Sequence, residues 1–231
     1  MSADTWPRFW AGSVLLLTCI ILGACAPKVL ALAGTPSDMK LPIIPIDTAP
    51  QLLHFKWNYR DETFGASGDG AVRLEGNDKA RLDFFLNNGM AGGYAILLGD
   101  SLFTPGGDFV KRLIPPAPLL WASLGRLALP ALPDTIVHIH NGMLLADIGD
   151  LQGADATASV GRAWRVAVAK RSLARVERIE RRRVIEWVEL QPSDSSRLVV
   201  RYVHEQGKRR LTITITDTTF VEGFDAAIWQ R

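Results

Sequence analysis

The sequence predicts a mainly β protein whose strands form one open or curved antiparallel sheet of the barrel class. Apolar side chains recur with a period of two along most of the chain, and turn residues separate these segments at short intervals. Little helix is expected, chiefly in one short stretch in the middle. Hydrophobic residues make up 48% and charged residues 22% of the 231 residues, which is the composition of a packed globular protein.

The chain begins with an apolar stretch from Trp10 to Ala26, and Arg8 lies just before it. This stretch is short for a membrane span, which needs about 20 apolar residues, and it matches the core of a signal peptide. It ends in Leu22-Gly23-Ala24-Cys25, which resembles the lipobox of bacterial lipoproteins. The resemblance implies that residues 1–24 are a signal peptide and that Cys25 is acylated. An uncleaved amino-terminal helix is the alternative, which Asp4 keeps open.

Acyl chains on Cys25 would anchor the protein to a membrane. Each buried methylene contributes about 0.8 kcal/mol, so one chain alone binds marginally and two or three bind stably. The next residues are Ala26, Pro27 and Lys28, with no Asp directly after the cysteine. In bacterial lipoproteins that Asp is the usual signal for retention in the inner membrane. We therefore expect an outer-membrane lipoprotein whose folded part faces the periplasm.

Residues 25–50 are expected to form a tether, because five prolines in this range interrupt any helix. Part of it, from Leu41 to Ile46, is apolar enough to pack on the folded domain. Residues 51–231 show no further shift of composition and are expected to form one β domain. Cys19 and Cys25 are the only cysteines, so this domain contains no disulfide.

The first half of the domain is expected to contain five strands. In the first of them Phe55, Trp57 and Tyr59 share one face. Gly65, Gly68 and Gly70 then predict turns or bulges, since their spacing does not match a phosphate-binding loop. The expected strands are Leu53–Arg60, Ala71–Leu74, Ala80–Leu86, Tyr94–Leu98 and Ser101–Phe103.

One short helix is expected in mid-chain, from Leu119 to Leu127. Pro118 suits the first turn of a helix, and Pro130 would stop it. The segment is apolar nearly all round. Such a helix is either fully buried or faces something apolar that is not part of the chain.

Strands resume after the helix, and the sheet as a whole is expected to contain about eleven strands. The stretch Leu173–Leu190 is ambiguous, because its apolar residues also fit a stripe on a helix. A hairpin that turns near Arg181-Arg182 is favoured. The expected strands are Thr135–Ile139, Met143–Ile148, Trp164–Ala169, Leu173–Glu180, Val184–Leu190, Leu198–His204 and Arg209–Thr216.

Three pieces of this sequence together carry a family resemblance. They are Trp57 followed by Gly68-Asp69-Gly70-Ala71-Val72-Arg73, then Lys79-Ala80-Arg81-Leu82-Asp83-Phe84-Phe85-Leu86, and finally Leu113-Ile114-Pro115-Pro116 before the Leu-Leu-Trp helix. They resemble the LolA/LolB-like lipoprotein-carrier superfamily, and more closely its lipid-anchored outer-membrane relatives of unknown role. The resemblance implies a half-barrel of about eleven antiparallel strands, with one or two short helices closing its mouth over an apolar cavity.

The resemblance also implies a function, which is to bind acyl chains of lipoproteins or other lipids and to sort or insert lipoproteins at the outer membrane. The apolar segment that touches the bilayer would be Leu102-Phe103 or, preferably, Leu119-Leu120-Trp121. The expected cavity-lining residues are Phe55, Trp57, Leu82, Phe84, Leu97, Leu120, Trp121 and Leu124. The alternative is a structural lipoprotein that has a fully packed sheet and recruits another envelope protein.

Other chemistry has little support in the sequence. His138 and His140 would point to one face of a strand, as two ligands of one metal ion do, but no third ligand is near. No GxSxG motif occurs, and Asp83, Asp147 and Asp150 lack an apolar pattern that would raise a carboxylate pKa, so we expect neither an enzyme nor a cofactor. The net charge of +2 gives no reason to expect nucleic acid. The basic stretch from Arg162 to Arg183 is either a solvated strand face or a contact for anionic headgroups.

Overall fold

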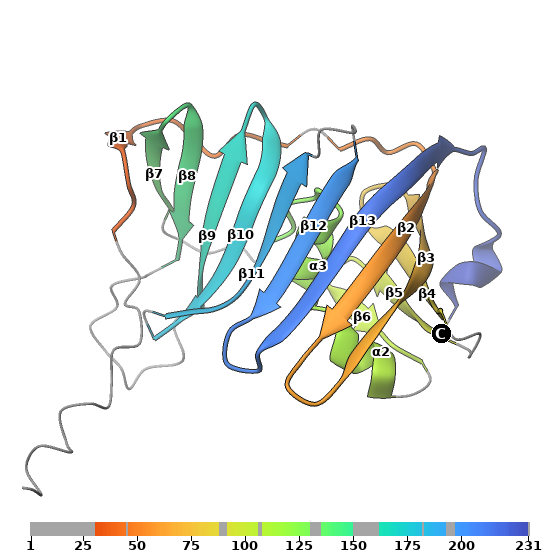
Figure 1. Ribbon diagram of the computed structural model, residues 1–231. Coiled ribbons are helices and arrows are strands. Elements are labelled where there is room, and N and C mark those ends of the chain that lie inside the picture. The colour runs from red at the N-terminus through yellow and green to blue at the C-terminus, as the bar shows by residue number, and fades with distance from the viewer. Residues whose placement is uncertain are drawn as a thin grey trace, which may run out of the picture.

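The computed structural model describes residues 31–44, 46–87, 92–105, 108–129, 135–149, 162–181, 183–192 and 197–230. These residues form one sheet of 13 strands in the order β1-β7-β8-β9-β10-β11-β12-β13-β2-β3-β4-β5-β6, and the neighbouring strands are antiparallel. The sheet is open, and two short helices, α2 and α3, lie behind it in Figure 1. The expectation of an open antiparallel sheet with little helix is confirmed. Residues 1–30, with the predicted signal peptide and Cys25, lie outside the described part.

The strands and helices follow one another with short connections. The first group of strands is β1 (Thr35–Ser37), β2 (Gln51–Arg60), β3 (Gly65–Glu75), β4 (Lys79–Leu86), β5 (Gly93–Leu98) and β6 (Ser101–Phe103). Helices α2 (Asp108–Leu113) and α3 (Ala117–Ser123) come next. The remaining elements are β7 (Thr135–His140), β8 (Met143–Ile148), β9 (Arg162–Ala169), β10 (Ser172–Glu180), β11 (Arg183–Pro192), β12 (Leu198–His204), β13 (Arg209–Phe220) and the 3₁₀ helix η2 (Ala226–Trp229).

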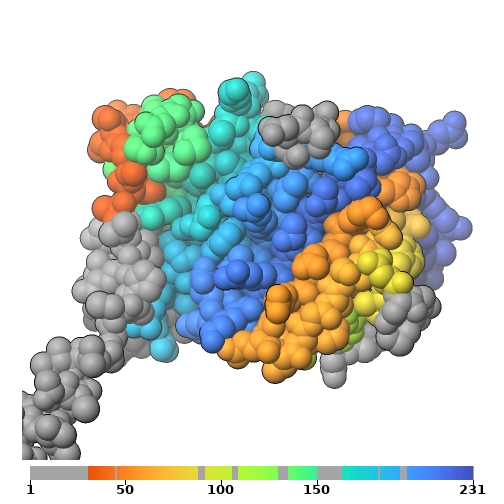
Figure 2. Space-filling model, in the orientation of Figure 1, coloured from red at the N-terminus to blue at the C-terminus, as the bar shows by residue number. Residues whose placement is uncertain are grey.

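The order of strands explains why the helices cover one face. Strand β6 is at one edge of the sheet, whereas β7 is next to β1 at the opposite edge. The connection from β6 to β7 therefore has to cross a whole face, and it carries both α2 and α3. The two halves of the chain meet in mid-sheet, where β13 pairs with β2. The face toward the viewer in Figures 1 and 2 carries no helix over β11, β12, β13 and β2.

The ambiguous stretch is a hairpin, as favoured from the sequence. Strands β10 and β11 pair antiparallel, with Val176 opposite Val188 and Ile179 opposite Val184. Arg181 between them has a φ of 49°, in the left-handed region typical of tight turns. Leu173 and Val176 of the apolar stripe that also fitted a helix are buried in the core, whereas Val184 and Trp187 are half-buried and the alternation of β11 assigns Trp187 to the other face.

The central helix is shorter than expected and starts earlier. It covers Ala117–Ser123 instead of Leu119–Leu127. Gly125 has a φ of 75°, a conformation that suits glycine and ends a helix, and the amide of Arg126 donates to the Trp121 carbonyl at 3.0 Å. A glycine within the apolar run thus stops the helix before Pro130 is reached.

The prediction of turns or bulges at Gly65, Gly68 and Gly70 was wrong, because all three lie within the long strand β3. A Cβ at Gly68 would lie 1.7 Å from the Phe85 carbonyl oxygen, and one at Gly70 would lie 2.2 Å from the Phe55 ring. The Phe55 ring of β2 therefore lies against Gly70 and the β4 backbone lies against Gly68, so that only glycine leaves room at either position. The expected strand starting at Ala71 is the second half of β3.

The segment expected to be a tether contributes to the fold. Strand β1 pairs with β7, with Pro36 opposite His138. Ile44 is buried, and Leu41 packs against the core. The chain between β1 and β2 runs along one end of the sheet (Figure 1). The described sheet thus has two strands more than the eleven implied by the family resemblance, and β1 is one that the sequence did not predict.

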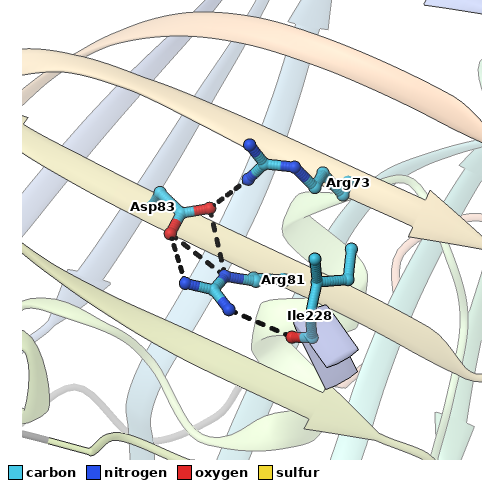
Figure 3. A network of polar contacts seen from close by, with 4 residues as sticks. All are labelled: Arg73, Arg81, Asp83 and Ile228. Carbon is cyan, nitrogen blue, oxygen red and sulfur yellow. Dashed lines mark hydrogen bonds and ion pairs between the residues drawn. The ribbon is translucent and has the colours of Figure 1, made fainter. Parts of the chain in front are cut away.

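The carboxyl-terminal segment is fixed to the face that the helices leave open. Figure 3 shows Asp83 of β4 between two guanidinium groups, those of Arg73 and Arg81. Arg81 also donates to the Ile228 carbonyl of η2 at 3.0 Å, and its guanidinium carbon lies 4.1 Å from the centre of the Tyr94 ring. One carboxylate therefore orients the arginine that holds η2. Within the described residues, no helix has the length and apolar content needed to cross a membrane.

Candidate functional site

Helix α3 is the centre of the covered face. Six of its seven residues are buried, and the helix packs against β10, β11 and β12. The sequence favoured Leu119-Leu120-Trp121 as the segment that touches a bilayer. That prediction was wrong, because these side chains are at most 2% exposed. Their apolar character is satisfied by the sheet, which is the first of the two possibilities that an all-round apolar helix allows.

The carboxyl-terminal end of α3 is tied to two turns of the sheet. The Trp121 indole donates to the Gly99 carbonyl at 2.8 Å, and Arg126 donates to the Gly76 carbonyl at 2.9 Å. The Arg126 guanidinium also lies 5.3 Å from the centre of the Trp121 ring, within cation–π range. Arg126 is nearly buried, and this burial lowers its pKa. These bonds fix one end of the helix over the β3–β4 and β5–β6 turns.

The eight residues expected to line a cavity are brought together. Phe55 and Trp57 of β2 pack edge-on against Phe84 of β4, with ring centres 5.5 Å and 5.8 Å apart. Seven of the eight belong to one apolar cluster, and Leu124 packs against it. The alternation of β2 and β4 was therefore assigned to the correct face. In this structure these side chains pack on one another, and a role in ligand binding is a proposal.

A cleft opens at the other end of the covered face, beside the linker between α2 and α3. It has a volume of about 330 Å³ and lies between this linker and the ends of β10 to β13. One side is apolar and the other is polar. Its lining residues are Leu102, Thr104, Lys111, Ile114, Pro115, Pro116, Arg178, Glu186, Tyr202, His204 and Arg209.

Glu186 is the buried charge of this cleft, with 1% of the residue exposed. Its Oε1 atom lies 2.7 Å from Nε of Arg178, and the Tyr202 hydroxyl donates to Oε2 at 2.6 Å. Arg178 also lies 3.2 Å from the Glu180 carboxylate. Burial, followed by the negative charge of Glu186, raises the pKa of Tyr202 well above its ordinary value. The Tyr202 hydroxyl therefore stays protonated and keeps donating to the carboxylate.

A second polar network lies beside the cleft, in the β2–β3 turn. The Asp61 carboxylate accepts hydrogen bonds from Nε of Arg112 at 2.6 Å, from the Tyr59 hydroxyl at 2.8 Å, and from the Thr63 and Phe64 amides, each at 2.8 Å. Desolvation opposes ionisation of Asp61, but these donors together lower its pKa well below the ordinary 3.8. Burial and the bond to Asp61 raise the pKa of Tyr59 to about 12. The network ties helix α2 to the turn.

The sequence did not identify the polar residues of this cleft. A signal for Glu186 was present, because it shares its side of β11 with Val188 and Leu190, on an apolar strand face. Arg178 likewise follows Val176 on the covered face of β10. A charged residue in an apolar alternation indicates either a buried ion pair or a binding site.

The histidine pair and the basic stretch have ordinary surroundings. Among the described residues, no three metal-ligating side chains gather, around His138 and His140 or elsewhere. In the basic stretch, Arg165 pairs with Asp147 at 2.7 Å, and Arg175 pairs with Glu177 at 2.7 Å. Arg165 and Asp147 lie opposite each other on β9 and β8, whereas Arg175 and Glu177 lie two positions apart on β10, so both arginines are compensated by carboxylates of the sheet. These pairs do not decide between the two alternatives that the sequence left open.

The fold has solved counterparts of low sequence identity. A LolA superfamily protein from Nitrosomonas europaea superimposes with a TM-score of 0.51 and 11% identity, over 81% of this chain and 93% of that one. A domain described as an outer membrane lipoprotein-sorting protein from Vibrio parahaemolyticus superimposes with a TM-score of 0.50 and 10% identity, over 79% of this chain and 90% of that one. The sequence matches no family model and no curated protein. The chain therefore has the half-barrel fold of the LolA-like proteins.

Proposed function

We propose that this chain is a lipid-anchored outer-membrane protein, facing the periplasm, that binds acyl chains of lipoproteins or lipids inside its half-barrel. The observation that carries the proposal is the crossover helix α3. A sheet of 13 strands is covered on one face mainly by a short helix that is apolar on nearly every side, and a cleft opens at one end of this cover. An apolar interior under a small, separate cover is suited to acyl chains.

The interior is closed in this structure, so binding requires α3 to move. The cleft, at about 330 Å³, is at the lower end of the range for small-molecule sites. Helix α3 is joined to α2 by Ile114-Pro115-Pro116, which lines the cleft. Movement of this linker away from β10–β12 would extend the cleft toward Leu120 and Leu124. In that open state the eight expected residues would line the acyl site.

The anchor proposed at Cys25 would keep the domain close to the membrane. Residues 26–34 separate Cys25 from β1, and nine residues reach at most about 30 Å when fully extended. The β1–β7 edge of the sheet would therefore face the bilayer. A Cys25→Ser variant is expected to lose incorporation of radiolabelled palmitate and to leave the membrane fraction. Unchanged labelling of that variant would refute the anchor.

Site-specific photo-crosslinking in cells tests the acyl site with the full chain. A photoreactive amino acid at Leu124, half-buried beside the core, is expected to crosslink to lipid or to an acylated protein. The same amino acid at Phe85, 54% exposed on the opposite face of β4, is the control. Intact-mass analysis identifies the adducts. Lipid adducts at Phe85 that equal those at Leu124 would contradict an interior acyl site.

The second candidate is a non-catalytic structural lipoprotein that recruits another envelope protein. It is favoured by one observation, which is that the interior side chains already pack on one another, as in the contact of Phe55 with Phe84. Under this function the Leu124 position would give no lipid adduct. An exposed position such as Phe85 would instead crosslink to one protein.

A further inference from the structure

A row of polar side chains crosses the covered face where its apolar part ends. Strand pairing places Arg178 opposite Glu186, Glu186 opposite His204, and His204 opposite Arg209. Side chains directly opposite each other on neighbouring strands lie on the same face, so these four form one line across β10, β11, β12 and β13. On all four strands the next position inward on that face is buried and apolar or aromatic: Val176, Val188, Tyr202 and Leu211.

The positive charges of this row and of Lys111, which lines the same cleft, are only partly compensated. Arg178 is balanced by Glu186, at 2.7 Å. Arg209 and Lys111, which both line the cleft, form no ion pair with any carboxylate of the described residues. The neighbouring acidic groups are already engaged, because Asp61 pairs with Arg112 and Glu62 pairs with Lys208. The cleft therefore has two cations without a counter-charge.

The opposite wall of the cleft is apolar. Leu102, Ile114, Pro115 and Pro116 face the polar row, and Ile114 is buried in the core cluster. His204 adds a donor, because its Nδ1 atom accepts the Gly207 amide at 2.8 Å and its Nε2 atom is left to donate. The cleft thus offers cations and a donor on one side and continuity with the apolar interior on the other.

We propose that this cleft binds the anionic headgroup of an amphiphile, with Arg209 and Lys111 holding the charge and the Ile114–Pro116 linker contacting the start of the acyl chain. The inference rests on the proposed acyl-binding function and specifies its ligand class as an anionic lipid. The buried Glu186 stays paired with Arg178 and accepts the hydrogen bond of Tyr202, and its charge limits the site to a small net positive charge. A free anion would gain nothing from the apolar wall, so the source is a lipid.

The test compares a diazirine-bearing C16 fatty acid with its methyl ester on the full chain in a non-ionic detergent at pH 8. Crosslinked protein is measured by intact mass. We expect the acid to label the wild-type chain about tenfold more efficiently than the ester, as one charge-assisted hydrogen bond would give. Arg209→Gln and Lys111→Gln are each expected to remove most of this difference and to leave ester labelling unchanged.

Arg210→Gln is the matched control, since it removes the same charge from the next position of β13, which is exposed on the other face. Retained ester labelling shows that each variant is folded. Equal labelling of the wild-type chain by acid and ester would overturn the headgroup site and leave the acyl carrier standing. No labelling by either probe would overturn both. Loss of the acid's advantage in millimolar inorganic phosphate would show a free-anion site and would overturn the lipid assignment.

Discussion

The Phe55 ring lies directly over Gly70 on the neighbouring strand, so that a Cβ built at Gly70 would lie 2.2 Å from Cζ of the ring. The Asp83 carbonyl oxygen would be 2.7 Å from the same Cβ. Since neither a buried ring nor a strand backbone can retreat easily, Gly70→Ala is expected to lower the free energy of unfolding by about 1–3 kcal/mol. Urea unfolding of the purified chain measures the loss.

Gly223→Ala is the control for this substitution, because a Cβ at Gly223 meets nothing within 4 Å. It is expected to be neutral or slightly stabilising, as alanine reduces the entropy of the unfolded chain. If both variants unfold at the same urea concentration, the Phe55 ring does not require a glycine at position 70.

Glu186 is expected to be required for stability, because its partner Arg178 is a positive charge on the covered face of the sheet. Glu186→Gln would leave Arg178 with Glu180 alone, and breaking such a buried pair costs about 3 kcal/mol of unfolding free energy. The double variant Glu186→Gln with Arg178→Met should recover part of this loss, since it leaves no buried charge without a partner. Glu180 loses Arg178 in this variant, but its side chain is 26% exposed to water. A double variant less stable than Glu186→Gln would contradict the pairing. Thermal unfolding monitored by circular dichroism gives the comparison.

Asp61 is expected to make stability depend on acid pH. Its folded-state pKa lies below the unfolded value of 3.8, so its contribution is complete above pH 3.8 and is lost as the pH falls toward the folded value. Urea midpoints measured between pH 6 and pH 2 should therefore fall less steeply in Asp61→Asn than in the wild-type chain. Parallel curves would show that Asp61 does not carry this dependence.

Trp121 is expected to stabilise the fold through its indole nitrogen as well as its ring. Trp121→Phe removes the bond to the Gly99 carbonyl and keeps an aromatic ring, so we expect a loss of about 1 kcal/mol or more in unfolding free energy. Trp187→Phe removes a bond of equal length, 2.8 Å, to the exposed Glu205 carboxylate, and should cost less. Equal losses would show that burial of the bond is unimportant. Chemical unfolding followed by circular dichroism suits both variants.

Local sequence determined most of the strands. The alternation in β2 assigns Phe55 and Trp57 to the buried face, because successive side chains of a strand point to opposite sides. Asn141 and Gly142 have positive φ values of 49° and 74°, the conformation of a tight hairpin turn, and this dipeptide marks the β7–β8 turn in the sequence. Such features need no information from distant parts of the chain.

Tertiary structure alone decided which residues lie opposite each other on neighbouring strands. Gly68 and Gly70 lie in a strand where the Phe85 carbonyl of β4 and the Phe55 ring of β2 leave no room for a Cβ, whereas a glycine in isolation predicts a turn. The row from Arg178 to Arg209 joins residues from four strands, and its alignment depends on the register of three hairpins. Period-two alternation specifies the face of each side chain within a strand. Register and the path of the α2–α3 crossover place these side chains in one cleft, because both depend on contacts between residues far apart in the sequence.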